Sequence, residues 1–224
     1  MQVGFLLFPH VQSLDLVGPL DVLAAVPEVT IHLLAPEAGL LQASSGLHLM
    51  ADTAFADCPA LDVLCVPGGA GIDAVMADDR YLAFIRAQAG QVNYLTSVCT
   101  GALALGAAGL LGGRRVTTHW AYHHLLEAFG AQAIAERVVR DGSLISGGGV
   151  TAGIDFALVV VAELFGEERA QHIQLALEYA PAPPFASGHP SEAPAVIVEA
   201  QMAALRAKVE ARAEAVARAV ARLG

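Results

Sequence analysis

The stretch that decides the fold is "VNYLTSVCTGALALGAAGLL", residues 92–111. An apolar run ends abruptly at Cys99, and Thr100, Gly101 and an alanine-rich helical run follow. A short continuous apolar run that turns at small residues into a helical pattern predicts a buried strand followed directly by a helix. In a parallel α/β sheet, ligands bind at the carboxyl ends of the strands, so the sequence predicts that Cys99 lies at such a site.

Three other apolar runs resemble this strand, and helical patterns lie between them. The runs cover residues 2–8, 29–35 and 61–67, and the helical patterns cover 13–26, 78–90, 117–130 and 151–166. Gly18-Pro19 is expected to interrupt the first of these helices. The alternation predicts an α/β fold with a mainly parallel sheet and helices on both faces.

The last part of the chain differs in composition. The segment 178–194, "EYAPAPPFASGHPSEAP", is rich in proline and is expected to be an irregular loop or linker. A long alanine-rich helix is predicted after it. The predicted organisation is an α/β domain over residues 1–190, with 191–224 as a helical extension of the same domain. One helix is too little for a helix-turn-helix module.

Charge and hydropathy restrict the class of protein. The chain has 224 residues, 55% of them hydrophobic, and a formal net charge of −10, which argues against nucleic acid as a partner. Five of the twelve basic residues lie in the last nineteen positions: Arg206, Lys208, Arg212, Arg218 and Arg222. They alternate with Glu210 and Glu214 as on a solvated helix face, with an anion-binding tail as the alternative.

Nothing in the sequence predicts a targeting segment, a membrane span or a disulfide framework. The three cysteines are odd in number and lack metal-site spacing. No signal-peptide pattern and no uninterrupted apolar stretch of about twenty residues is present. We therefore expect a cytoplasmic protein that does not associate with membranes.

Cys99 is the candidate nucleophile. The N–H groups and the positive dipole end of the helix after it would lower the pKa of the thiol and favour a thiolate at neutral pH. A sharp strand-to-helix turn carrying a nucleophile is the nucleophile elbow, here with Cys in place of Ser. Cys65, inside a strand, and Cys58, in a loop, are interpreted as structural or incidental.

Two nearby loops offer partners for Cys99. The run "VPGGAGI", 66–72, could present backbone N–H groups as an oxyanion hole, or could be only a tight turn. Asp15 lies between Leu14 and Leu16, where burial would raise its pKa and allow it to carry a proton, or it could be a helix cap.

Histidines provide a further possibility. His119, His123 and His124 lie on one predicted helix, and His119 could pair with Cys99. His119 and His123 would share a face, but no third ligand is evident, so neither a metal nor any other cofactor is predicted. Trp120, Tyr122 and Phe156 could line a pocket or belong to the core.

The motifs together resemble a known superfamily. "VPGGAG" followed by "SVCTGALALGAAGLLGGRRVTTHW", 97–120, resembles the DJ-1/PfpI superfamily, whose flavodoxin-like α/β fold is related to class I glutamine amidotransferases. Within it, residues 10–23 and 175–194 are similar to the isocyanide hydratase branch. Thr100 after the cysteine differs from the protease-like branch, and Asp15 stands where the DJ-1 branch has Glu. The domain of AraC-type regulators shares residues 14–23 but carries an added DNA-binding domain.

The resemblance implies an activity and its residues. It implies hydration of isocyanides to N-substituted formamides through a covalent thioimidate on Cys99, with Asp15 as proton donor and base. Thr100 would donate a hydrogen bond, and backbone N–H groups at Gly69 and Ala70 would hold developing negative charge. A homodimer acting on a small isocyanide is implied. The alternatives are another activity of the superfamily, such as a glyoxalase or carbonyl repair, or a non-catalytic redox sensor or ligand-binding module.

Overall fold

A computed structural model describes all 224 residues. A central seven-stranded sheet has the order β10-β11-β7-β6-β1-β2-β5. Its strands are β1 (Gln2–Leu6), β2 (Thr30–Ala35), β5 (Thr53–Ala54), β6 (Val63–Val66), β7 (Tyr94–Val98), β10 (Val138–Asp141) and β11 (Leu144–Gly147). All neighbours pair in parallel except β10 and β11. The predicted mainly parallel sheet is therefore confirmed, and the four apolar runs form β1, β2, β6 and β7.

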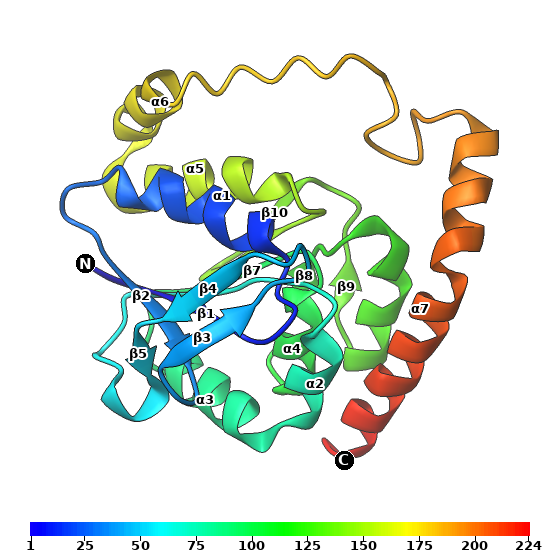
Figure 1. The fold of residues 1–224 in the computed structure, drawn as a ribbon, viewed down its shortest axis with the longest axis horizontal. Coiled ribbons are helices and arrows are strands. Elements are labelled where there is room, and N and C mark those ends of the chain that lie inside the picture. The colour runs from blue at the N-terminus through cyan, green and yellow to red at the C-terminus, as the bar shows by residue number, and fades with distance from the viewer.

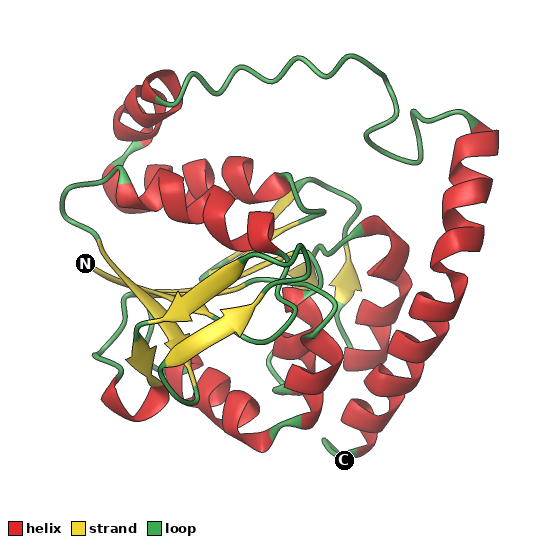
Figure 2. Ribbon diagram, viewed as in Figure 1, coloured by secondary structure: helices red, strands yellow, loops and turns green.

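Helices cover both faces of this sheet (Figures 1 and 2). On one face lie α1 (Ser13–Ala24), α5 (Ala152–Phe165) and α6 (Glu167–Ala176). On the other lie α2 (Ile72–Ala77), α3 (Asp79–Ala89), α4 (Gly101–Ala107), the 3-10 helix η2 (Trp120–Phe129) and α7 (Ala195–Ala221). Each face has its own apolar core, and the sheet between them contributes residues to both because strand side chains alternate.

Small elements complete the fold. They are the 3-10 turn η1 (Phe55–Asp57), an antiparallel hairpin of β3 (Gly39–Gln42) and β4 (His48–Ala51), and a parallel pair of β8 (Arg115–Val116) and β9 (Gln132–Ala133). The sequence patterns did not predict these elements, nor α2, α6, β10 and β11. Most are too short for a period of hydrophobic residues to be visible.

Two local predictions differ from the structure. α1 continues through Pro19 instead of breaking there. Gly18 and Gly153 let α1 and α5 approach closely, and the Pro19 ring packs against Gly153, so helix packing outweighs the lost backbone hydrogen bond. The predicted helix 117–130 ends at Gly130 as expected, with φ 73°, but it begins only at Trp120, with His119 as its N-cap.

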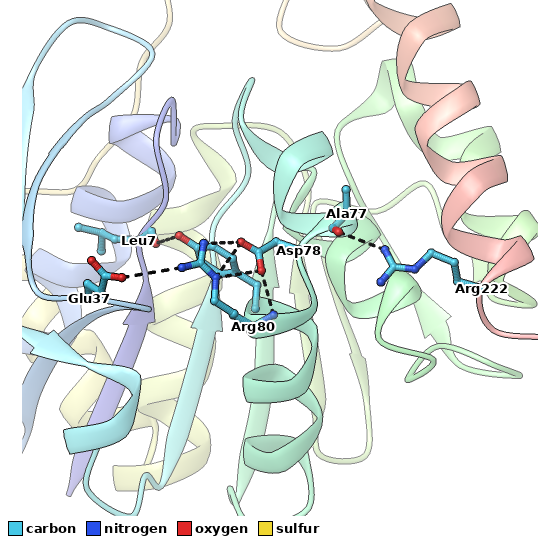
Figure 3. Close-up of polar contacts among 7 residues, drawn as sticks. Leu7, Glu37, Ala77, Asp78, Arg80 and Arg222 are labelled. Atoms are coloured by element: carbon cyan, nitrogen blue, oxygen red, sulfur yellow. Dashed lines mark hydrogen bonds and ion pairs between the residues drawn. The ribbon is translucent and has the colours of Figure 1, made fainter.

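α7 returns to the domain only over its second half. An irregular segment over residues 177–194 leads away from α6, and the first turns of α7 stand clear of the domain (Figure 1). Its second half buries Arg212, Ala215, Val216 and Ala219 against η2, α2 and α4. Near its end, the Arg222 guanidinium donates to the Ala77 carbonyl at 3.2 Å (Figure 3).

Arg80 makes several contacts at Asp78, the residue that joins α2 to α3. Asp78 caps α3 by accepting from the Arg80 backbone N–H at 2.9 Å, and the Arg80 side chain doubles back onto the same carboxylate, with Glu37 nearby (Figure 3). Arg222, at the end of α7, contacts the same α2–α3 junction through the carbonyls of Met76 and Ala77. No helix of the structure has the length and apolar character needed to cross a membrane.

Candidate active site

Three connections meet at the carboxyl ends of the neighbouring strands β1, β6 and β7. The first turn of α1, after β1, carries Asp15, the loop after β6 carries Gly69 and Ala70, and the turn after β7 carries Cys99 and Thr100. In the strand order β2-β1-β6-β7-β11, successive strands are added on one side of β1 and then on the other, so the topological switch point lies between β1 and β6, where flavodoxin-like folds bind their ligands. The predicted location of Cys99 at the end of a buried parallel strand is confirmed.

The backbone at Cys99 forms a nucleophile elbow. Cys99 has a φ of 55°, in the left-handed region that non-glycine residues rarely adopt. Its N–H donates to the carbonyls of Gly147 and Gly148 at 3.0 and 2.9 Å, and its carbonyl accepts from Thr118 Oγ1 at 2.6 Å. These three hydrogen bonds hold the strained conformation, as expected for strain stored at a functional position.

Gly101 makes the sharp turn possible. A Cβ at this position would lie 1.9 Å from the Val66 carbonyl oxygen, so any side chain would collide with the backbone at the end of β6. The start of α4 therefore lies directly against the neighbouring strand. This close approach brings the loop after β6 next to Cys99.

Asp15 is the partner that the structure gives to Cys99. The carboxyl is fully buried, and its Oδ2 accepts from the Gly68 N–H at 3.0 Å. Oδ1 has no hydrogen-bond partner. The Cys99 thiol lies beside this carboxyl, and each group affects the pKa of the other. The alternative that Asp15 caps α1 is excluded, because the N-cap is Gln12 and no side chain caps this helix.

Burial raises the pKa of both members of the pair. The pKa of Asp15 rises to about 7, although the hydrogen bond from Gly68 and the neighbouring thiol oppose this rise. The pKa of Cys99 is raised well above its usual value, first by burial and then by the Asp15 charge, while the Thr100 N–H and Arg212 act in the opposite direction.

The prediction of a free thiolate at Cys99 is therefore wrong for this resting geometry. A sequence pattern shows the helix N-terminus after the cysteine but neither the burial of the thiol nor the carboxyl beside it. Because ionising both groups would bury two adjacent negative charges, the pair keeps a proton between them near neutral pH. The prediction that Asp15 has a raised pKa is confirmed.

The loop after β6 is not available as an oxyanion hole. The Gly69 N–H donates to Thr100 Oγ1 at 3.1 Å, so it is not free for a substrate, contrary to the expectation. The Ala70 N–H faces the His10 carbonyl, because Val11 and Gly69 form an antiparallel bridge whose other bond runs from the Gln12 N–H to the Gly68 carbonyl at 2.8 Å. Because Thr100 Oγ1 accepts from Gly69, its own proton remains available for donation.

The histidines do not form the expected pair with Cys99. His119 lines the same cavity, but its Nδ1 accepts from the Ala121 N–H at 3.3 Å, and burial lowers its pKa. His123 contacts Thr117 at 3.2 Å instead. No group of three His, Cys, Asp or Glu side chains has a geometry that could hold a metal ion.

A cavity of about 690 Å³ opens above Cys99. Cys99, Thr100 and Ala70 form part of its floor, and Trp120 and Tyr122 line it, whereas Phe156 belongs to the core. Residues of the proline-rich segment and one side of α7 complete its wall: Ser187, Gly188, His189, Pro190, Ala193, Ile197, Val198, Gln201, Leu205, Lys208, Ala211 and Arg212. The two parts of the chain that looked peripheral in sequence thus line one side of the cavity.

Arg212 is the residue of this site that sequence reasoning misplaced. It was assigned to a solvated face, but its side chain is only 8% exposed. Arg206, Lys208, Arg218 and Arg222 are exposed as expected, although Arg222 also pairs with Asp79. Arg212 falls on the same side of α7 as Val209, Ala215 and Val216. This apolar side of the helix is the signal that could have distinguished Arg212 from the exposed basic residues.

The chain belongs to the DJ-1/PfpI family, whose model matches residues 1–163. Among its relatives, an isonitrile hydratase of Pseudomonas putida is 59% identical over 89% of this chain and 87% of that protein. A crystal structure of a ThiJ/PfpI family protein from Pseudomonas syringae superposes with a TM-score of 0.93 at 39% identity, covering 96% of this chain and 90% of the other.

A more distant relative has a different architecture. An HTH-type transcriptional regulator of Pseudomonas aeruginosa, GbdR, is 30% identical over 74% of this chain, but this covers only 47% of the regulator. The resemblance to regulators expected from residues 14–23 is thus found, and it is confined to about half of that protein.

Proposed function

We propose that this protein is an isocyanide hydratase that converts R–N≡C and water to R–NH–CHO. The observation that carries the proposal is the buried pair of Cys99 and Asp15 at the floor of a cavity. The 59% identity to an isonitrile hydratase over most of both chains supports the same reaction.

In the first half-reaction, Cys99 is the nucleophile and Asp15 carries the proton. Asp15 takes the thiol proton as the sulfur attacks the terminal carbon of the isocyanide and an S–C bond forms. Asp15 then delivers that proton to the same carbon, which gives the thioimidate R–N=CH–S. A carboxyl with a pKa of about 7 is suited to both steps, because it gains and loses a proton with similar ease at neutral pH.

In the second half-reaction, water replaces the sulfur. Asp15 takes one proton from water as the water oxygen adds to the thioimidate carbon, and passes that proton to the nitrogen, which gives R–NH–CH(OH)–S–Cys99. The C–S bond then breaks as the C=O bond forms, the hydroxyl proton passes through Asp15 to the sulfur, and the formamide leaves. The Thr100 hydroxyl would donate a hydrogen bond to charge that develops during these steps. The sequence of steps uses no metal or organic cofactor.

The test is formamide production from cyclohexyl isocyanide. Cys99→Ala should abolish turnover, and Asp15→Asn should lower kcat by about 10²–10⁴ because the proton carrier is lost. Cys58→Ser is the matched control, since this thiol lies in a loop outside the cavity and its loss should leave kcat within about twofold.

Two results would redirect the assignment. Methylglyoxal consumption without formamide production would favour another activity of the family. A wild-type protein without turnover of either substrate, whose Cys99 is readily oxidised, would favour a redox sensor. The raised pKa of Cys99 counts against the sensor, since oxidation follows thiolate character and exposure.

A further inference from the structure

A glycine-rich turn connects β11 to α5 and holds the backbone of Cys99. Its residues, 147–151, read Gly-Gly-Gly-Val-Thr. The carbonyls of Gly147 and Gly148 accept the Cys99 N–H at 3.0 and 2.9 Å, and Val150 lines the cavity. Glycine loses more conformational freedom on folding than any other residue, so the position of these carbonyls depends on what the rest of the fold does to the turn.

Arg137, the residue before β10, contacts both ends of this turn. Its backbone carbonyl accepts the Gly148 N–H at 2.8 Å. Its side-chain Nη2 donates to the Thr151 carbonyl at 2.9 Å and to Thr151 Oγ1 at 3.3 Å. The main chain of Arg137 therefore holds the start of the turn, and its guanidinium holds the end.

A carboxylate fixes the direction of this guanidinium. Arg137 Nε donates to Asp155 Oδ2, in the first turn of α5, and the Tyr179 hydroxyl donates to the same oxygen at 3.2 Å. A planar guanidinium that donates to a carboxylate through Nε and to a carbonyl through Nη2 is held in one orientation.

The alternative is an ordinary surface ion pair. The Arg137 side chain is 52% exposed, and such pairs contribute little to the free energy of unfolding. Arg140 provides the comparison, because it is 49% exposed and reaches Glu163 of α5 at 2.7 Å without contacting the turn. Arg137 differs from it by holding the segment that carries the acceptors of the Cys99 N–H.

We infer that Arg137 is a positioning residue, which maintains the strained backbone of Cys99 by fixing the turn 147–151. Because the backbone angles of Cys99 set the direction of its side chain, the same restraint sets the place of the sulfur relative to Asp15. The catalytic consequence rests on the proposed hydration, whereas the restraint on the backbone does not.

Three variants of the full-length protein test the inference. Arg137→Gln removes the guanidinium and leaves the backbone bond to Gly148. Arg137→Lys can pair with Asp155, but a single ammonium cannot reproduce the planar fork that reaches Asp155 and Thr151 together. Arg140→Gln is the matched control, because it removes an equally exposed ion pair to the same helix.

We expect Arg137→Gln to lower kcat for cyclohexyl isocyanide at least fivefold with KM changed by less than threefold, since a misplaced sulfur impairs the chemical step more than binding. Hydrogen exchange at the Cys99 amide should become at least tenfold faster. The melting temperature should change by no more than about 4 °C, as for an exposed ion pair. Arg137→Lys should show the same losses, and Arg140→Gln should leave kcat and exchange unchanged.

The exchange measurement keeps this inference separate from the proposed function. If the wild-type protein hydrates no isocyanide, the proposed function fails, and exchange at Cys99 still decides whether Arg137 restrains the backbone. Unchanged exchange in Arg137→Gln would overturn the restraint, and faster exchange with an unchanged kcat would overturn its catalytic consequence.

Two further results would count against the contact with the turn. Wild-type kcat and exchange in Arg137→Lys, or equal losses in Arg140→Gln, would show that an ion pair to α5 is all that is needed. If Arg137→Gln does not fold, Asp155→Asn, which removes the charge that orients the guanidinium, is measured with the same criteria.

Discussion

At the scale of single residues, the proposed chemistry depends on two ionisable groups that are buried, whereas the free side chains are surrounded by water. Asp15 is a fully buried carboxyl, and Cys99 is a buried thiol beside that carboxyl. Either group alone would be an inert core residue. Together they form a pair that holds a proton near neutral pH and can pass it on, which is what addition of S–H across an isocyanide carbon needs.

The pair predicts a pH profile. The reaction starts with Asp15 ionised and able to take the thiol proton, so kcat/KM should rise with pH and level off above an apparent pKa of about 7. This value belongs to the free enzyme and is measured from initial rates between pH 5 and pH 9. A flat profile, or one with its midpoint near the usual value for aspartate, would contradict the assignment of Asp15 as base.

The raised pKa of Asp15 also affects the free energy of unfolding, which should fall with rising pH while kcat/KM increases. Because burial raises the pKa of Asp15 in the folded protein, the folded state holds this proton up to about pH 7, whereas the unfolded chain releases it near the usual aspartate value of 3.8. This group's contribution to the free energy of unfolding is therefore greatest below pH 4 and falls as the pH rises towards 7. In Asp15→Asn this component of the pH dependence should disappear.

At the scale of elements, the junctions between strands and helices matter more than the elements themselves. β7 enters α4 through a turn that leaves no room for a Cβ, because the carbonyl of Val66 in the next strand occupies that space. Backbone, unlike a flexible side chain, cannot move aside without disturbing the sheet. The geometry of the nucleophile is thus set by the packing of two strand ends.

Gly101→Ala tests this junction. The added methyl group would force β6 and α4 apart, and we expect a loss of about 3 kcal/mol in the free energy of unfolding together with a large loss of activity. Chemical denaturation measures the first and formamide production the second. Gly112→Ala is the control, since nothing lies within 4 Å of a Cβ there, and wild-type stability in Gly101→Ala would mean that the close contact is absent in solution.

At the scale of the whole molecule, apolar side chains between α6 and the first half of α7 remain outside both cores. They include Leu175, Phe185, Val196, Ile197 and Met202, of which Leu175 is 80% and Phe185 78% exposed. Such a set is unusual on a monomer and is typical of a surface that another chain covers. This agrees with the homodimer that the family resemblance implies, and a dimer remains a prediction.

Sedimentation velocity tests the oligomeric state. We expect a species of twice the 23.1 kDa chain mass, and a shift to the monomer when Phe185 and Ile197 are both replaced by Asp. A wild-type monomer over the accessible concentration range would contradict the prediction. Leu40→Asp in the β3–β4 hairpin is the control, since this exposed side chain lies on a different part of the fold.

The sequence by itself determined the α/β class, the four central strands and the position of Cys99, because buried parallel strands are continuous apolar runs and small residues mark the sharp turn after them. It also identified Asp15 as a carboxyl in apolar surroundings. Tertiary structure alone decided which groups meet: that Asp15 and not His119 lies beside Cys99, that Thr100 uses the Gly69 N–H, and that Arg212 is buried. The physical reason is that periodicity reports the burial of one face of an element, whereas a pKa or a hydrogen bond depends on side chains that residues far apart in the chain bring together.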